Sequence, residues 1–376
     1  MNADTIINAL PSDHRSGVFV GRAQSPDGPC VIAIREGRLF DLTSEVATMS
    51  GAIGRRSFSG GRDLGPVEDG LPEGWTLLSP IDLQCIKASG VTFAVSAIER
   101  VIEERARGDA SAAASIREQL EAKVGAGIRS VVPGTAEAAE LKAALIEEGM
   151  WSQYLEVAIG PDAEIFSKSP VLSSVGHGAE VGVRSDSSWN NPEPEVVLVC
   201  DPHGEIVGAT LGNDVNLRDF EGRSALLLSK AKDNTASCAL GPFIRILDDG
   251  FTLEDIRTAE VALTISGRGD GYRLEGTNRM AEISRDPVEL VRQCLSEHHY
   301  PDGFVLFCGT LFAPTQDREE AGAGFTHKPG DEVTISSERI GTLVNTVTTS
   351  RDAQPWTFGI AELMRNLGGR GLIDRI

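Results

Sequence analysis

The stretch from residue 190 to 219 constrains the fold more than any other part of the chain. It reads NNPEPEVVLVCDPHGEIVGATLGNDVNLRD. The pattern predicts two strands, over residues 196–200 and 205–211, joined by a turn at residues 201–204 (DPHG). An antiparallel hairpin brings the residues after its second strand back toward those before its first strand. We therefore expect the chain to be organised around this hairpin.

Three carboxylates fall at the same end of the hairpin. Glu193 and Glu195 are two residues apart, and side chains at that spacing point to the same face of a strand. The returning strand carries Asp214 toward them. Three such carboxylates repel one another unless a cation lies among them, and oxygen ligands suit Mg²⁺ first, with Mn²⁺ or Ca²⁺ as alternatives. The pattern indicates a metal site, while spacing alone also allows a hairpin with solvated acidic ends.

The overall composition limits the partners and the compartment. The chain has 376 residues, 41% of them hydrophobic, which is enough for one large domain and a smaller one. Its net charge of −20 predicts that it repels nucleic acid and anionic membranes. Its six cysteines are scattered, and it shows neither a signal peptide nor an apolar run of transmembrane length. We expect reduced cysteines and a cytoplasmic location.

The pattern before residue 75 differs from the pattern after it. Short apolar runs over residues 17–43, separated by Gly and Pro-Asp-Gly turns, predict a small N-terminal β-rich domain over 1–75. Residues 51–73 are dense in glycine and charge, and we interpret them as its exit loop. A catalytic domain is expected over 76–376.

Helical spacing precedes the hairpin and returns near the end of the chain. It predicts helices over 92–107, 111–123 and 136–149, which together suggest a helical lid or subunit contact within about 92–150. Asp286 followed by Pro287 is typical of a helix start. A last helix is expected from Thr357 as its cap through Leu367.

Four segments in order resemble the fumarylacetoacetate hydrolase family. They are PEPEVVLV, GATLGNDVNLRD, SKAKDNTASCALGPFI and FVLFCGTLFAP, and the closing strands HKPGDEVTISSERIGTLVNTV follow them. The match covers roughly residues 165–347. It implies an α+β, β-rich fold, a mixed β-sheet roll with a small N-terminal β-rich domain and peripheral helices. It also implies a homo-oligomer, a dimer or tetramer, that takes a small-molecule 2-keto acid.

The resemblance assigns roles to individual residues. It implies that the metal ligands are Glu193, Glu195 and Asp214. Lys232 matches the lysine that helps to stabilise an enolate, with Lys230 as a rival and a solvated lysine as the alternative. Thr310 matches the threonine that approaches the substrate, although a strand-end threonine also satisfies backbone groups.

Other basic residues near the hairpin are weaker candidates. Lys168 and Arg184 lie just before the metal strand, where they can meet a substrate carboxylate, but exposed basic residues are common. His177 lies in a glycine-rich run and is more typical of a loop residue than of a base.

The segment after Thr92 departs from the family's hydrolases. Those carry Asn-Tyr-x-x-His followed by a glutamate, whereas GVTFAVSAIERVIEERARG contains no histidine. Without a base that holds water, hydrolysis loses its nucleophile. A metal, a lysine and helix glutamates remain, which suits removal of the C3 proton of a 2-keto acid and loss of its C4 hydroxyl. Resemblance to related dehydratases of the family implies Glu103 as the base, in preference to Glu99 and Glu104, and all three are alternatively a solvated helix face.

Three features resemble the family's sugar-acid dehydratases. They are the length of the chain, the segment TFAVSAIERVIEERARG and the segment VGVRSDSSWNNPEPE. This resemblance implies Mg²⁺-dependent conversion of 2-keto-3-deoxy-D-pentonate (xylonate or arabinonate) to 2,5-dioxopentanoate in oxidative pentose catabolism. The alternatives within the fold are hydrolysis of an acylpyruvate, and decarboxylation or isomerisation of a related keto acid. A third alternative is a metal-binding protein without catalysis.

Overall fold

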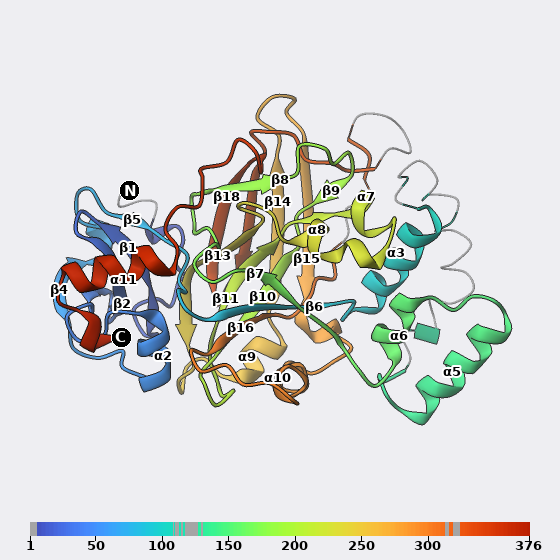
Figure 1. The fold of residues 1–376 in the computed structure, drawn as a ribbon, viewed down its shortest axis with the longest axis horizontal. Coiled ribbons are helices and arrows are strands. Elements are labelled where there is room, and N and C mark those ends of the chain that lie inside the picture. Colours follow the sequence, from blue (N-terminus) through green and yellow to red (C-terminus); the bar gives the residue numbers. More distant parts are fainter. Residues whose placement is uncertain are drawn as a thin grey trace.

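The computed structural model describes residues 6–107, 131–312, 316–318 and 324–376, together with the single residues 109, 113, 116, 127 and 128. Most of the helix predicted over 111–123 lies outside these described residues. In the described part of the chain the strands form three sheets, and helices pack around them (Figure 1).

The largest sheet has eleven strands in the described chain and is mixed. Its order is β4-β3-β2-β1-β13-β11-β10-β16-β6-β7, with β5 paired to β1, and the pair β16–β6 is parallel whereas the other pairs are antiparallel. The strands are β1 (Phe19–Ser25), β2 (Gly28–Arg35), β3 (Arg38–Asp41), β4 (Arg62–Pro66), β5 (Thr76–Leu77), β6 (Cys85–Gly90), β7 (Glu164–Ser169), β10 (Pro194–Cys200), β11 (Ile206–Asp214), β13 (Cys238–Ile246) and β16 (Phe304–Phe307).

A five-stranded sheet packs against the centre of the large one. Its order is β15-β14-β17-β18-β8, made of β8 (Glu180–Val183), β14 (Glu260–Ser266), β15 (Arg273–Arg279), β17 (Glu332–Ser337) and β18 (Gly341–Thr349). The third sheet is a two-stranded ribbon of β9 (Asn190–Asn191) and β12 (Asn216–Leu217).

The helices lie at both ends and along the edges of the sheets. They are α2 (Met49–Arg55), α3 (Ala94–Arg105), α5 (Ala136–Glu147), α6 (Gln153–Ile159), α7 (Arg218–Glu221), α8 (Leu228–Lys232), α9 (Leu253–Arg257), α10 (Pro287–Leu295) and α11 (Ile360–Gly369). Within the described residues, none of them has the length and apolar character needed to span a bilayer.

Strand β10 is buried on both faces, which explains its unbroken apolar run. Val196 and Leu198 pack in the core shared with the five-stranded sheet, whereas Val197 and Val199 pack in the core that contains α2. A strand covered on both sides carries no polar alternation. The predicted hairpin is confirmed, and β11 is longer than expected because it pairs with β13 as far as Asp214.

Two local predictions are wrong. Residues 51–73 are not simply a loop, because they contain most of α2, whose Ala52 and Ile53 are buried, and all of β4. The last helix is not capped by Thr357; α11 follows Gly359, which makes no side-chain cap. The start of α11 coincides with packing of Leu363 and Leu367 on Ala47 rather than with a capping side chain.

The helix start at Asp286 is confirmed, since its side chain accepts a hydrogen bond from the backbone of α10.

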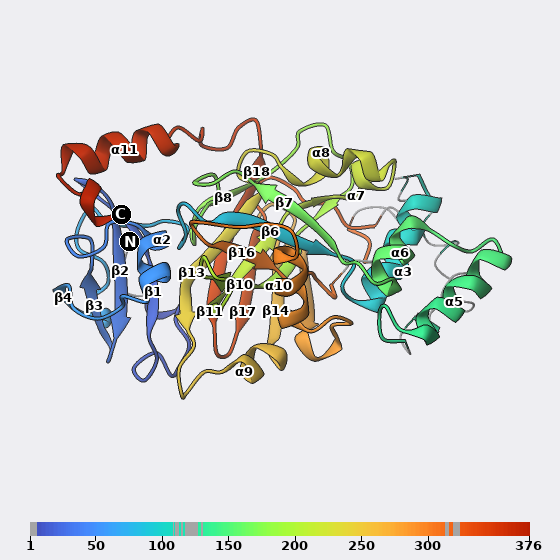
Figure 2. The same ribbon diagram turned by 60° about the horizontal axis from the view of Figure 1, so that its bottom comes forward.

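The N-terminal strands and the helical insert lie at opposite ends of the molecule (Figures 1 and 2). The N-terminal strands continue the large sheet through the β1–β13 pair, and α11 packs beside them. At the other end, α3, α5 and α6 share an apolar core of their own. The domain boundary near residue 75 and the role of the helices within about 92–150 stay predictions.

Candidate active site and metal centre

The hairpin brings three acidic side chains together. In the β10–β11 register Pro194 faces Asn213, and the backbone N–H of Asp214 donates to the carbonyl of Glu193 at 3.1 Å. One carboxylate oxygen from each of Glu193, Glu195 and Asp214 lies within 4.8 Å of the other two. All three side chains are buried. The sequence prediction that these residues converge is therefore confirmed, while their role as metal ligands stays a prediction.

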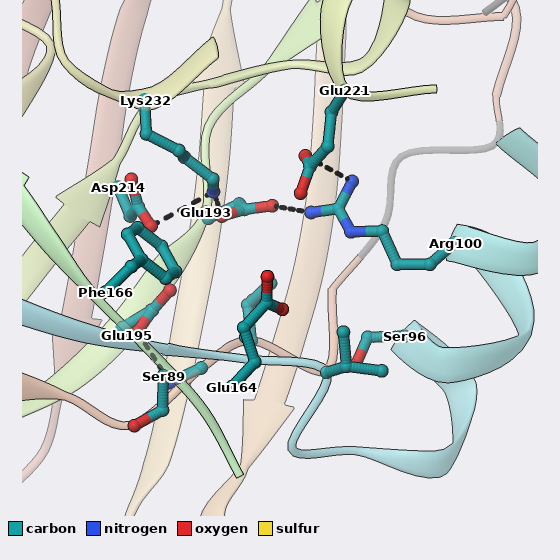
Figure 3. A pocket seen from close by; sticks show the side chains of 14 residues that line it. Ser89, Ser96, Arg100, Glu164, Phe166, Glu193, Glu195, Asp214, Glu221 and Lys232 are labelled. Carbon is teal, nitrogen blue, oxygen red and sulfur yellow. Dashed lines mark hydrogen bonds and ion pairs between the residues drawn. The ribbon is translucent and has the colours of Figure 1, made fainter. Parts of the chain in front are cut away.

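These acids form part of the wall of a cavity inside the protein. Figure 3 shows that its wall comes from several elements: the hairpin, β7, α3, α7 and α8. Its charged lining residues are Arg100, Glu164, Glu193, Glu195, Asp214, Glu221 and Lys232. A lining with this many charged groups suits a charged ligand.

Two buried lysines neutralise part of the trio. Lys232 on α8 donates to Glu193 and lies 3.0 Å from Oδ2 of Asp214. Burial alone would lower the pKa of Lys232, but Asp214, Glu193 and Glu221 outweigh it and raise the pKa. Lys168 on β7 is fully buried, and its Nζ lies 2.8 Å from Oδ1 of Asp214. Lys232 is therefore charged, and both lysines point into the acidic cluster.

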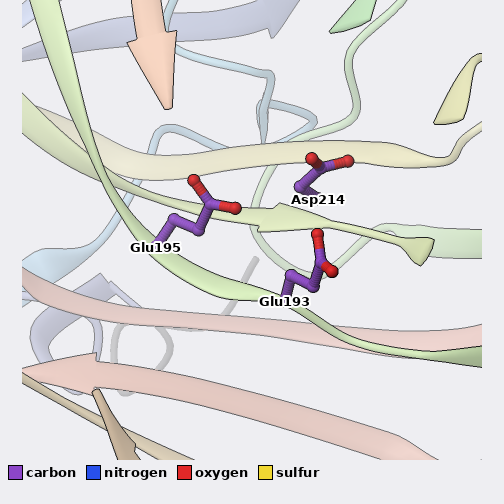
Figure 4. Close-up of side chains that lie close together, drawn as sticks. All are labelled: Glu193, Glu195 and Asp214. Atoms are coloured by element: carbon purple, nitrogen blue, oxygen red, sulfur yellow. The ribbon is translucent and has the colours of Figure 1, made fainter. Parts of the chain in front are cut away.

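Glu195 is the member of the trio that lacks a cation. Figure 4 shows its carboxylate facing those of Glu193 and Asp214. One oxygen accepts a hydrogen bond from the backbone N–H of Gly309 at 2.6 Å, but no lysine or arginine among the described residues forms an ion pair with it. Burial and the two neighbouring acids raise its pKa well above the ordinary value. An oxygen-ligated divalent cation fits this arrangement, because it would supply the missing charge.

The glutamates of α3 are engaged elsewhere. Glu103 is buried between Arg100 and Arg218, each 2.6 Å away, and these two cations outweigh burial and lower its pKa. Glu99 lies 3.0 Å from Arg218. Glu104 accepts hydrogen bonds from two side chains at the start of α6. None of the three lines the cavity that contains the trio.

Two acids that sequence reasoning missed do line this cavity. Glu164, the first residue of β7, points toward the trio (Figure 3) and forms no hydrogen bond or ion pair with any described residue. Burial raises its pKa, opposed by the charges of Arg100 and Lys232. Glu221 on α7 lies 2.9 Å from Arg100, and burial raises its pKa to about 7. The sequence carried no clear signal for either, because an acid at a strand start or in a short helix is usually solvated.

Comparison with known sequences decides the family. The profile of the fumarylacetoacetate (FAA) hydrolase C-terminal family matches residues 139–348, which is more than half of the chain. The chain belongs to the fumarylacetoacetate hydrolase family.

Two curated members of the family are similar over about half of this chain. It is 36% identical over 203 residues to a probable 2-keto-3-deoxyxylonate dehydratase of Haloferax volcanii. It is 34% identical over 188 residues to the 2-dehydro-3-deoxy-D-arabinonate dehydratase of Saccharolobus solfataricus. These matches cover 54% and 50% of this chain, and 66% and 59% of the relatives. The matched part thus spans less than two thirds of the length of each relative.

The fold of a solved family structure agrees with this assignment. The structure of a 2-keto-3-deoxy-D-arabinonate dehydratase complexed with magnesium and 2,5-dioxopentanoate superposes with a TM-score of 0.63 at 22% identity. The superposition covers 89% of this chain and 99% of that one. The predicted fold class, α+β and rich in strands, is confirmed.

The remaining residues that the family resemblance singled out have different surroundings. Thr310 is buried and lines the cavity, where its hydroxyl accepts from the backbone of Phe312 at 3.1 Å. Arg184 pairs with Asp186 at 2.8 Å and is not among the described residues that line the cavity. Lys230 is exposed, and His177 accepts from the backbone N–H of Val344 at 3.2 Å, away from the lining. Lys168 is a partner of Asp214 rather than an exposed base.

Proposed function

We propose that this chain is a magnesium-dependent dehydratase that converts a 2-keto-3-deoxy-D-pentonate (xylonate or arabinonate) to 2,5-dioxopentanoate. The carrying observation is a single cavity in which three buried carboxylates converge and Glu164 faces them without a partner among the described residues. The names of the two dehydratases at 36% and 34% identity support this reading. The family structure that holds magnesium and 2,5-dioxopentanoate supports it as well.

Glu193, Glu195 and Asp214 would hold the Mg²⁺, and the same oxygen ligands suit Mn²⁺ or Ca²⁺. When bound, the ion polarises the keto group of a 2-keto acid and makes its C3 protons acidic.

Lys232 supplies a fixed positive charge on the same side of the cavity. Its ammonium lies against Glu193 and Asp214, so it faces the oxygen at which negative charge develops when C3 loses a proton. Lys168 holds the opposite oxygen of Asp214 and keeps that side chain oriented. Thr310, across the cavity, is in reach of the bound acid as an orienting hydroxyl.

Glu164 is better suited than Glu103 to take the proton. A general base needs a carboxylate that is free to accept a proton and a pKa raised toward the working pH. Glu164 meets both conditions, because burial raises its pKa and no described residue occupies its oxygens. Glu103 meets neither, since two arginines hold both of its oxygens and lower its pKa.

The steps balance with these residues alone. Glu164 removes a C3 proton, the C4–O bond breaks, and Glu164 returns the proton to the leaving hydroxide, which departs as water. The unsaturated alcohol that remains then rearranges through an enol to the C5 aldehyde. No water is added at any step, so no water-activating base is required.

Hydrolysis of an acylpyruvate fits the cavity less well. In the family's hydrolases a histidine–glutamate pair activates the water, and none of the described residues lining the cavity is a histidine. Use of a small-molecule keto acid follows from the proposal. The dimer or tetramer, the cytoplasmic location, and the absence of nucleic-acid and membrane partners stay predictions.

The full chain, incubated with Mg²⁺ and 2-keto-3-deoxy-D-xylonate, should release an aldehyde detectable with a coupled aldehyde dehydrogenase. The same compound is also called 2-keto-3-deoxy-D-arabinonate, because C4 is its only stereocentre. Glu164→Gln should lower kcat roughly 10²- to 10⁴-fold while Mg²⁺ still raises the melting temperature. The matched variant Glu103→Gln should chiefly lower stability, because it weakens a buried ion pair with Arg218.

Two results would contradict the proposal. One is cleavage of an acylpyruvate with no aldehyde formed from the 2-keto-3-deoxy-D-pentonate. The other is loss of turnover in folded Glu103→Gln with turnover retained in Glu164→Gln, which would return the base to α3.

A further inference from the structure

A second cavity adjoins the one that contains the acidic trio. It has about 270 Å³ of empty space and shares Ser96, Arg100, Glu193 and Thr310 with the first cavity. Figure 3 shows Ser96 and Arg100 coming from α3 on the side of the first cavity opposite Lys232. The rest of its wall consists of Glu99, Glu103, Asn191, Asn216, Arg218 and Phe312. The two cavities therefore meet at Glu193, one of the three converging acids.

Two neighbouring amides in this wall have unused hydrogen-bonding groups. Asn216 of β12 is paired with Asn191 of β9, and side chains directly opposite in an antiparallel pair lie on the same face. Asn216 is fully buried, and neither its Nδ2 nor its Oδ1 has a partner among the described residues. The Nδ2 of Asn191 donates to the carbonyl of Pro192 at 2.9 Å, whereas its Oδ1 has no partner in the same part of the chain.

The charged groups of the same wall are already paired with one another. Arg218 holds Glu99 at 3.0 Å and Glu103 at 2.6 Å, and Arg100 holds Glu103 and Glu193. A buried amide without a partner is unfavourable, so a partner is expected at Asn216. What the wall offers to a ligand is thus neutral donors and acceptors, which match a hydroxyl group rather than an ion.

We infer that this cavity binds the terminal hydroxyl of the substrate, and that Asn216, with Asn191 beside it, determines specificity for a 2-keto acid that carries a hydroxyl beyond C4. The inference rests on the proposed function. If the carboxylate and keto group lie at the trio, the far end of the chain must leave the first cavity past one of its walls. The wall at Glu193 and Thr310 leads to these amides.

Another hollow near α3 suits that end of the substrate less well. It is lined largely by apolar residues, among them Val95, Ile128 and Val131. A hydroxyl there would lose its hydrogen bonds to water without replacement. Conversely, a substrate without the hydroxyl would leave the amides of the second cavity unpaired, which is how polar sites reject deoxy analogues.

The test compares 2-keto-3-deoxy-D-xylonate with its 5-deoxy analogue 4-hydroxy-2-oxopentanoate, each with the full chain and Mg²⁺. The readout is the kcat/KM for the sugar acid divided by the kcat/KM for the 5-deoxy analogue. Each is measured from the disappearance of the substrate, separated from its product by chromatography. Asn216→Leu, which keeps approximate shape and removes the amide, should lower this ratio roughly 10- to 100-fold. The kcat/KM for the 5-deoxy analogue should stay unchanged.

A matched control and a second variant keep the test decisive. Thr210→Val removes another buried polar group without a described partner, on β11 and outside both cavities, and should leave the ratio unchanged. Asn191→Leu should lower the ratio as well. If Asn216→Leu does not fold, the ratio measured for Asn191→Leu tests the inference.

An unchanged ratio in both asparagine variants would overturn the inference and assign the amides to water. An equal fall in kcat/KM for the sugar acid and for the 5-deoxy analogue would overturn it too. A wild-type chain that acts on neither substrate would instead refute the proposed function.

Discussion

Two clusters of charge, each with a buried centre, are built on different principles in this molecule. The carboxylate cluster consists of Glu164, Glu193, Glu195, Asp214 and Glu221 with Arg100, Lys168 and Lys232. The Arg318 cluster consists of Asp270, Arg318, His327, Lys328 and Asp331. Each gathers acids and bases from distant parts of the chain, yet only one of them has matched charges.

In the Arg318 cluster the opposite charges match. Arg318 binds both oxygens of Asp331, at 2.5 and 2.7 Å, in the forked geometry that suits a guanidinium and a carboxylate. Its Nε and the Nζ of Lys328 each lie 3.1 Å from Asp270. Burial lowers the pKa of His327 despite a hydrogen bond to Asp331, so this histidine is neutral. Two carboxylates thus face two cations, as expected of a cluster that stabilises the fold.

In the carboxylate cluster the charges do not match. Five carboxylates face three cations, and Glu195 and Glu164 have no ion-pair partner among the described residues. Such a surplus of buried negative charge is unfavourable without a ligand. We therefore expect the unmatched cluster to receive a cation and a substrate, whereas the described charges of the Arg318 cluster balance one another.

The largest expected effect follows from removing a charge that has no cationic partner among the described residues. Glu195→Gln should lower kcat roughly 10³-fold or more, because the cation contributes several kcal/mol to the reaction. The free energy of unfolding without metal should change little, since the substitution removes repulsion from Glu193 and Asp214 and breaks no ion pair among the described residues. Aldehyde formation and urea unfolding in EDTA measure the two effects.

The matched cluster should respond in the opposite way. Asp331→Asn should lower the free energy of unfolding by about 3–5 kcal/mol, because it leaves the buried guanidinium of Arg318 without its forked partner. The kcat of the folded enzyme should stay near wild type. Urea unfolding and a turnover assay below the melting temperature check this. A variant that keeps its stability but loses turnover would remove the distinction between the clusters.

Acidification should have a smaller effect and should act on Glu164 before Asp331, because the pKa values of these two residues shift in opposite directions. Burial raises the pKa of Glu164, so its basic form is lost at a higher pH than for an ordinary glutamate, near 4.3. For Asp331, hydrogen bonds from Arg318 and His327 outweigh burial and lower the pKa to about 2. The stability contributed by Asp331 is therefore complete above the unfolded pKa near 3.9 and is lost as the pH falls toward 2.

On lowering the pH, turnover should thus decline while the melting temperature is still close to its neutral value. Profiles of kcat/KM and of melting temperature against pH test this order. If both fall together across the same range, the raised pKa of Glu164 does not limit catalysis.

The sequence could indicate the trio because its geometry is local. Glu193 and Glu195 share a strand face, and one hairpin returns Asp214 to them. Glu164 could not be found in this way, because it reaches the cavity only through the β6–β7 pair at the far edge of the large sheet.

The same limit explains the preference for Glu103. Helical periodicity puts Glu99, Glu103 and Glu104 on α3 but does not say what each one faces. The partner that engages Glu103, Arg218, follows the hairpin more than a hundred residues later. The prediction that Lys168 meets a substrate carboxylate has the same limit, since its burial against Asp214 depends on tertiary packing.

Anomalous diffraction from crystals soaked in Mn²⁺, as a stand-in for Mg²⁺, would show directly whether the trio binds a divalent cation. We expect one strong peak between the carboxylates of Glu193, Glu195 and Asp214, and none within the Arg318 cluster. Three acids turned away from one another with no ion between them would contradict the metal site and the chemistry proposed for it.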